Sequence, residues 1–139
     1  MITMAHPIER FPHTRHHALT TAAFVTLFWI AAAALVIAAH VDLDPLSPIA
    51  GAVATIGAIV VAAYCYTRIV AQNAGATHAL SVGIAWLALS IVAEITMTTH
   101  LGHAWFSLIG SPNRPLLRNI FLFAWIFAPA LFARREENS

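Results

Sequence analysis

Four long apolar runs, separated by short polar connections, divide the chain. They lie at 18–39, 49–70, 79–98 and 116–132, and each is close to the roughly 20 residues that an α-helix needs to cross a bilayer. The runs are continuous rather than alternating, which favours helices over the strands of a membrane β-barrel. Short connections make successive helices antiparallel neighbours. The pattern therefore predicts an all-α fold, an integral membrane four-helix antiparallel bundle forming one domain over residues 1–139.

The parts of the chain outside the runs are a polar N-terminal segment, 1–17, and three connections. The first two connections are short and contain turn-forming residues such as Pro, Gly, Asn and Asp. The third connection, 99–115, is longer, and its middle, 104–109, is apolar and aromatic. We expect this middle part to lie in the lipid headgroup region, where Trp105 is favourably placed.

Composition narrows the class of protein. Hydrophobic residues make up 60% of the chain and charged residues only 9%, whereas a soluble domain carries about a quarter charged residues. Lipid is therefore the expected solvent for most of the surface. There is no run of basic residues, so nucleic acid is not an expected partner. With Cys65 as the single cysteine, neither an intrachain disulfide nor a cysteine-based metal site can form.

The arginines predict the orientation in the membrane. Arg114 and Arg118 fall on one side of the predicted bundle, and the other five arginines fall on the opposite side: Arg10, Arg15, Arg68, Arg134 and Arg135. By the positive-inside rule the side with five arginines is cytoplasmic. Both termini and the segment 1–17 are then cytoplasmic, and the connection 99–115 faces outward.

A stripe of alanines in the second run suggests how the helices pack. Ala50, Ala54, Ala58 and Ala62 recur at four-residue spacing, which places them on one helix face. Helices in lipid approach closely through small residues, so the stripe predicts a packing seam. The alternative is that alanine is simply frequent in this chain.

Glu94 is the one acidic residue inside a run, and its expected neighbour is Arg118 on the fourth helix. A buried ionisable group in lipid is costly, so it usually has a partner or a task. In one interpretation, Glu94 and Arg118 form an ion pair that fixes the register of two helices. In the other, Glu94 is a proton or cation site of a small transporter, with Arg118 as its counter-ion.

Histidines provide a second candidate site. His40, His100 and His103 lie at the outward ends of the first and third helices, near Asp42 and Asp44. Imidazole and carboxylate groups suit zinc or copper, and His40 with His100 would be the pair for a haem. No zinc motif is matched, so ordinary interfacial histidines remain the alternative, and no cofactor is predicted as the first expectation.

No catalytic motif is present, since the sequence holds no phosphate-binding loop, nucleophile elbow or His-Glu-x-x-His. The first functional hypothesis is therefore an accessory or structural subunit that acts through helix–helix contacts, as a homo-oligomer or within a larger membrane complex. A transporter or ion-binding protein using Glu94 and Arg118 is one alternative. A metal- or haem-binding membrane protein using His40, His100 and His103 is the other.

The last part of the chain, from Val82 to Arg134, carries a recognisable set of features. They are Gly83, Trp86, Glu94, Trp105, Leu108, Arg118, Trp125 and Pro129. In these features the stretch resembles a group of uncharacterised small bacterial four-helix inner-membrane proteins. The resemblance implies a bacterial inner membrane and implies no activity.

Overall fold

The computed structural model describes residues 13–101, 108–110 and 113–134, and all regular structure in these ranges is helical. Four helices follow one another along the chain: α1 (His13–Leu43), α2 (Pro48–Ile69), α3 (Ala76–Leu101) and α4 (Pro115–Leu131). Each corresponds to one of the predicted apolar runs, with ends that differ by a few residues. The all-α fold with four helices is therefore confirmed.

Three of the helical segments are long and apolar enough to cross a membrane. They are Arg15–Leu43, Pro48–Ile69 and Ala76–His100, with 29, 22 and 25 residues. Helix α4 is also apolar but has only 17 residues. At 1.5 Å per residue it is about 25 Å long, somewhat less than the hydrocarbon core of a typical bilayer.

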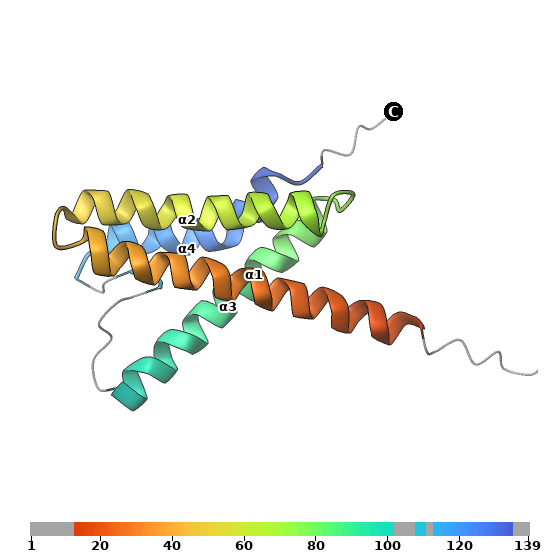
Figure 1. The fold of residues 1–139 in the computed structure, drawn as a ribbon, viewed down its shortest axis with the longest axis horizontal. Coiled ribbons are helices and arrows are strands. Elements are labelled where there is room, and N and C mark those ends of the chain that lie inside the picture. The colour runs from red at the N-terminus through yellow and green to blue at the C-terminus, as the bar shows by residue number, and fades with distance from the viewer. Residues whose placement is uncertain (1–12, 102–107, 111–112, 135–139) are drawn as a thin grey trace, which may run out of the picture.

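The helices alternate in direction, so that α1 and α3 run one way and α2 and α4 run the other (Figure 1). Helix α1 packs mainly against α2, and α3 packs mainly against α4. Helix α2 also contacts α4, whereas α1 and α3 meet over a smaller area. Figure 1 shows why, because α3 crosses α1 obliquely and the two helices diverge beyond the crossing.

A chain of aromatic rings, one from each helix, forms the centre of the core. Phe28 contacts Tyr66 with 5.6 Å between ring centroids, and Tyr66 contacts Trp86 at 6.0 Å. Trp86 then contacts Trp125 at 6.2 Å. All three contacts are edge-to-face, the arrangement that aromatic quadrupoles favour. This row of aromatic rings connects all four helices at one level of the bundle.

Two tryptophans fasten the crossing of α1 and α3. Trp86 Nε1 donates to the backbone oxygen of Val25 at 3.0 Å, and Trp29 Nε1 donates to Ser90 Oγ at 2.9 Å. A buried indole N–H needs an acceptor, and here each helix supplies the acceptor for the other. The crossing point is therefore fixed by two reciprocal hydrogen bonds.

The approach of α3 to α4 depends on a glycine. A Cβ atom at Gly83 would collide with the backbone carbonyl of Ile126. On the face of α3 that the sequence predicts to point inward, Gly83, Trp86 and Ser90 are buried, and Glu94 is half-buried. Small residues at this contact allow the two backbones to approach closely.

The alanine stripe of α2 lies at the flank of the buried face. Ala62 is buried, Ala54 and Ala58 are half-buried, and Ala50 is exposed. The row that faces the other helices is rotated from the stripe, and its buried members include Gly51, Thr55, Ile59, Ala63 and Tyr66. The stripe is thus only partly used by contacts within the described part of the chain.

Candidate functional site

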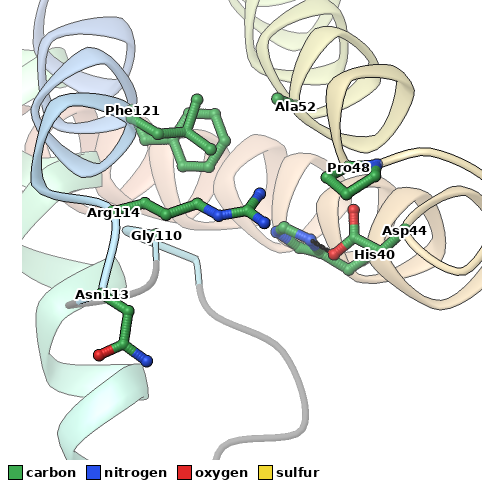
Figure 2. Close-up of a pocket in the computed structure, with 9 residues that line it drawn as sticks. His40, Asp44, Pro48, Ala52, Gly110, Asn113, Arg114 and Phe121 are labelled. Carbon is green, nitrogen blue, oxygen red and sulfur yellow. Dashed lines mark hydrogen bonds and ion pairs between the residues drawn. The ribbon is translucent and has the colours of Figure 1, made fainter.

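A pocket of about 460 Å³ opens at the end of the bundle where α1 ends and where α2 and α4 begin. Figure 2 shows residues from these elements facing one another across it. We call this end of the molecule the histidine rim. The pocket is lined by His40, Asp44, Pro48, Ala52, Gly110, Asn113, Arg114, Leu117 and Phe121.

His40 and Asp44 form a pair one helical turn apart at the end of α1. The distance from His40 Nδ1 to Asp44 Oδ2 is 2.8 Å. An ionised carboxylate only accepts hydrogen bonds, so the shared proton belongs to Nδ1. The other ring nitrogen, Nε2, is buried and has no hydrogen-bond partner among the described residues. The His40 side chain is 13% exposed, so the orphaned nitrogen lies in the pocket wall rather than in open solvent.

Asp44 is held against the first turn of α2. A Cβ atom at Gly51 would collide with the Asp44 carboxylate, so only glycine leaves room for this contact. Ser47 caps the same turn by accepting a hydrogen bond from Ala50 N at 3.4 Å. Negative charge is favoured at a helix N-terminus, where unpaired N–H groups and the helix dipole are positive. The dipole therefore stabilises the carboxylate that orients His40.

Arg114 occupies the N-cap position of α4, directly before Pro115. A cation is unfavourable there, because the helix dipole is already positive at this end. The guanidinium makes no hydrogen bond or ion pair with any residue that the structure describes. Figure 2 shows it reaching toward the imidazole of His40. Arg114 therefore adds a positive charge, which the helix dipole opposes, to a pocket that also holds the carboxylate of Asp44.

The residues Leu108 to Gly110, which we call the return segment, form another wall. Leu108 and Ile109 are buried. Ile109 N donates to Glu94 Oε2 of α3 at 3.1 Å, and Trp125 Nε1 of α4 donates to the Leu108 oxygen at 2.8 Å. The return segment is therefore held between α3 and α4, with Gly110 left to line the pocket.

Gly110 closes the return segment against α4. Its φ angle is +92°, a conformation that side chains rarely adopt, and a Cβ atom there would lie 2.9 Å from the Arg118 Cα. Glu94 and Arg118 therefore contact the same segment from two helices. No ion pair joins them in the described part of the chain. The return segment therefore contacts both residues of the predicted pair.

The interfacial position expected for 104–109 is described only at its end, where Leu108 and Ile109 are buried within the protein. Trp105 lies outside the described residues.

The remaining histidine-site residues are not gathered around His40. His100 and Asp42 are both exposed, and His103 lies outside the described residues. Figure 1 shows the C-terminal end of α3 apart from the connection between α1 and α2. Within the ranges described, no group of three or more His, Cys, Asp or Glu side chains is placed to hold a metal ion.

The sequence places His40 near Asp42 and Asp44 but does not connect Arg114 with it. The signals were available: Asp44 follows His40 by four residues, and Arg114 precedes a proline that starts a helix. Arg114 enters the sequence analysis only through the predicted orientation. Among the described residues, neither the guanidinium of Arg114 nor Nε2 of His40 has a hydrogen-bond partner. The guanidinium suits an anionic group, and Nε2, with the ring proton on Nδ1, suits a hydroxyl donor on the same ligand.

The opposite end of the bundle carries a second polar pocket, of about 630 Å³, which we call the arginine rim. Its arginines are Arg68, in the last turn of α2, and Arg134, just beyond α4. Arg134 Nη1 donates to Asn73 Oδ1 at 3.2 Å, and the Arg68 guanidinium lies 5.3 Å from the centre of the Tyr64 ring. These cations lie near helix C-termini, where the dipole favours them.

No family model matches the chain, and no curated protein and no solved structure shows significant similarity to it.

Proposed function

We propose that the chain is a multi-pass integral membrane protein of the bacterial inner membrane, with four spans and both termini cytoplasmic. Three long apolar helices support this proposal, together with the excess of arginine on the side of the termini. Helix α4 is short, and a slight tilt of its neighbours or a thinner bilayer around it accommodates the difference.

Reporter fusions test the orientation. A cytoplasmic reporter fused after Gln72 is expected to be active, and a periplasmic reporter fused after Asp44 is expected to be active as well. The reverse pattern at both positions contradicts the proposed topology.

The proposed activity is binding of a small ligand that carries a carboxylate or phosphate group, in the pocket of the histidine rim. The observation that carries it is the pairing of two unused groups across one pocket, the orphaned Nε2 of His40 and the guanidinium of Arg114. Arg114 supplies the charge for the anion, and a charge-assisted hydrogen bond is stronger than a neutral one. With the proton on Nδ1, His40 Nε2 is an acceptor, so it accepts a hydrogen bond from a hydroxyl group of the ligand, such as the P–OH of hydrogen phosphate, with the ring orientation fixed by Asp44.

The binding test measures thermal unfolding of the purified protein in mild detergent, with inorganic phosphate and with succinate as separate probes. A ligand that binds only the folded state stabilises it by about 2.7 kcal/mol at a hundredfold excess over Kd. We expect stabilisation by at least one probe in the wild type and its loss in Arg114→Gln and in His40→Phe. Stabilisation of equal size in these variants overturns the proposal.

Arg134→Gln is the matched control, because it removes the same charge from the arginine rim. It is expected to keep the ligand-dependent stabilisation. If Arg134→Gln and Arg114→Gln reduce it equally, the effect is general charge screening rather than binding at the histidine rim.

An accessory or structural subunit that acts through helix–helix contacts is the second candidate function. The outward flank of α2 favours it, because a Cβ atom at Gly57 would meet no atom within 4 Å, and the nearby Ala50, Ala54 and Ala58 are not fully buried. Such a flank of small residues suits close contact with a helix of another subunit. Ala54→Leu is expected to change the oligomeric state in detergent, whereas Val53→Leu, on an exposed position, is not. An unchanged oligomeric state in Ala54→Leu removes this candidate.

A further inference from the structure

A groove lies between α1 and α3. Figure 1 shows that these two helices cross obliquely and diverge toward their N-terminal ends. The closed end of the groove is the crossing point, where Trp86 donates to the backbone of Val25. Its volume is about 770 Å³, within the range of ligand-binding clefts. The groove opens toward the arginine rim, because the lining begins at His17 of α1 and His78 of α3, near the starts of both helices.

The lining changes in character along the groove. Small or branched apolar residues form most of it, including Ala22, Val25, Ala85 and Leu89. The end near the rim instead carries the imidazoles of His17 and His78. A groove with one polar end and one apolar end fits an amphipathic molecule.

His78 is prepared for a polar ligand by a buried neighbour. Its Nε2 lies 3.0 Å from the hydroxyl of Tyr66, and the two rings are stacked with 12° between their planes. When Tyr66 donates this hydrogen bond, the proton of the neutral imidazole is on Nδ1. Nδ1, which has no described partner, is then a donor for an anionic headgroup.

The length of the groove favours an acyl chain over a transmembrane helix as the bound group. From His78 to Leu89 the helix rises by about 16 Å, close to half of the roughly 30 Å hydrocarbon core. A transmembrane helix of another subunit needs the whole thickness, whereas one acyl chain in a single leaflet needs half of it. The crossing of α1 and α3 closes the groove at that depth.

We propose that this groove binds one acyl chain of a phospholipid, with the phosphate of its headgroup at His17 and His78. The inference rests on the proposed membrane insertion and is independent of anion binding at the histidine rim. The site lies in the leaflet of the arginine rim, and it makes a specific lipid a component of the folded protein between α1 and α3.

The test is native mass spectrometry of the protein delipidated in detergent and then titrated with phosphatidylglycerol. We expect one bound lipid per chain in the wild type. Ala22→Phe fills the groove and is expected to lower the affinity about tenfold or more. Ala23→Phe is the matched control, because Ala23 is exposed and does not line the groove, and it is expected to bind like the wild type.

A headgroup variant separates the polar end from the apolar end. His78→Phe is expected to weaken phosphatidylglycerol but to leave binding of a diacylglycerol with the same chains unchanged. Equal binding of phosphatidylglycerol by the wild type and by Ala22→Phe overturns the proposal. The proposal is also overturned if the lipid-free wild type forms a dimer and Ala22→Phe disrupts it, because the groove then binds a second copy of the chain. Partition of the chain into the membrane fraction, measured separately, shows whether a negative result reflects this groove or the proposed membrane insertion.

Discussion

The two rims of the bundle carry comparable polar pockets but use arginine in opposite electrostatic settings. At the arginine rim, Arg68 and Arg134 lie near the C-termini of α2 and α4, where the negative end of each dipole favours them. At the histidine rim, Arg114 lies at the N-terminus of α4, where the dipole opposes it. The same side chain is therefore favoured by the helix dipole at one end of the bundle and opposed by it at the other.

The electrostatic setting of each arginine helps to identify a candidate binding site in a chain without catalytic motifs. An arginine near the C-terminus of a helix is stabilised by the helix dipole, so its position needs no ligand to account for it. Positive charge that the local backbone opposes needs an anion for its compensation. His40 Nε2, beside Arg114, is likewise unsatisfied among the described residues, because it is buried and has no hydrogen-bond partner there.

The largest effect that distinguishes the rims is expected from Glu94→Ala. It leaves the buried N–H of Ile109 without its described acceptor, at a cost of about 1–3 kcal/mol, and it frees the wall that Gly110 contributes to the histidine rim. Thermal unfolding in detergent measures the stability, and the phosphate and succinate titrations measure the pocket. Both are expected to decline.

Arg118→Gln is the comparison for Glu94→Ala. With no ion pair to Glu94 it is expected to change stability by less than about 0.5 kcal/mol. If Arg118→Gln loses as much stability as Glu94→Ala, and the Glu94→Gln, Arg118→Gln double variant recovers it, the assignment of Glu94 to the return segment is contradicted. That result supports the ion pair between Glu94 and Arg118 instead.

A smaller effect is expected from Gly51→Ala, which displaces the Asp44 carboxylate from the first turn of α2. Because the clash is with the end of a flexible side chain, we expect a cost at the low end of the about 1–3 kcal/mol that is typical of overpacking. The displaced carboxylate no longer orients His40, so ligand binding weakens as well. Gly57→Ala is the matched control on the same helix. Because it meets open space, it is expected to be neutral or stabilising by up to about 1 kcal/mol. Equal behaviour of the two variants shows that Asp44 is not confined by Gly51.

The smallest effect is expected at the arginine rim. Asn73→Ala removes an exposed hydrogen bond to Arg134, which is worth no more than about 1 kcal/mol. Stability is expected to fall slightly, and binding of phosphate or succinate is expected to stay unchanged. A loss of ligand binding in Asn73→Ala contradicts the contrast between the rims.

The apolar pattern predicted the helices because the length and continuity of each run are local properties of the chain. The steep crossing of α3 over α1 is not local, since it depends on Trp29 and Trp86 finding acceptors on a neighbouring helix. The return segment escaped prediction for a different reason. Leu108 and Ile109 are apolar, and burial against lipid headgroups or against protein favours the same residues.

The candidate site was only half predictable. His40 stood out as a histidine at the end of an apolar run, but its expected companions Asp42 and His100 are exposed, and neither forms the described contact with it. Helix phase decides between Asp42 and Asp44, because residues four positions apart share a helix face and residues two positions apart do not. Arg114 comes from a helix distant in sequence, and a single sequence carries no signal for that proximity.

The return segment also has a consequence for the order of events during biosynthesis. The α1–α2 hairpin joins neighbouring parts of the chain, so it can pack soon after its residues leave the ribosome. The hydrogen bond between Ile109 and Glu94, and that between Trp125 and Leu108, can form only after the later residue of each pair has been synthesised. Helices α3 and α4 can pack fully only after that point. A nascent chain halted before Trp125 therefore holds a finished first hairpin and an unfinished second one, and that halted chain is the species that a chaperone or a quality-control protease would meet.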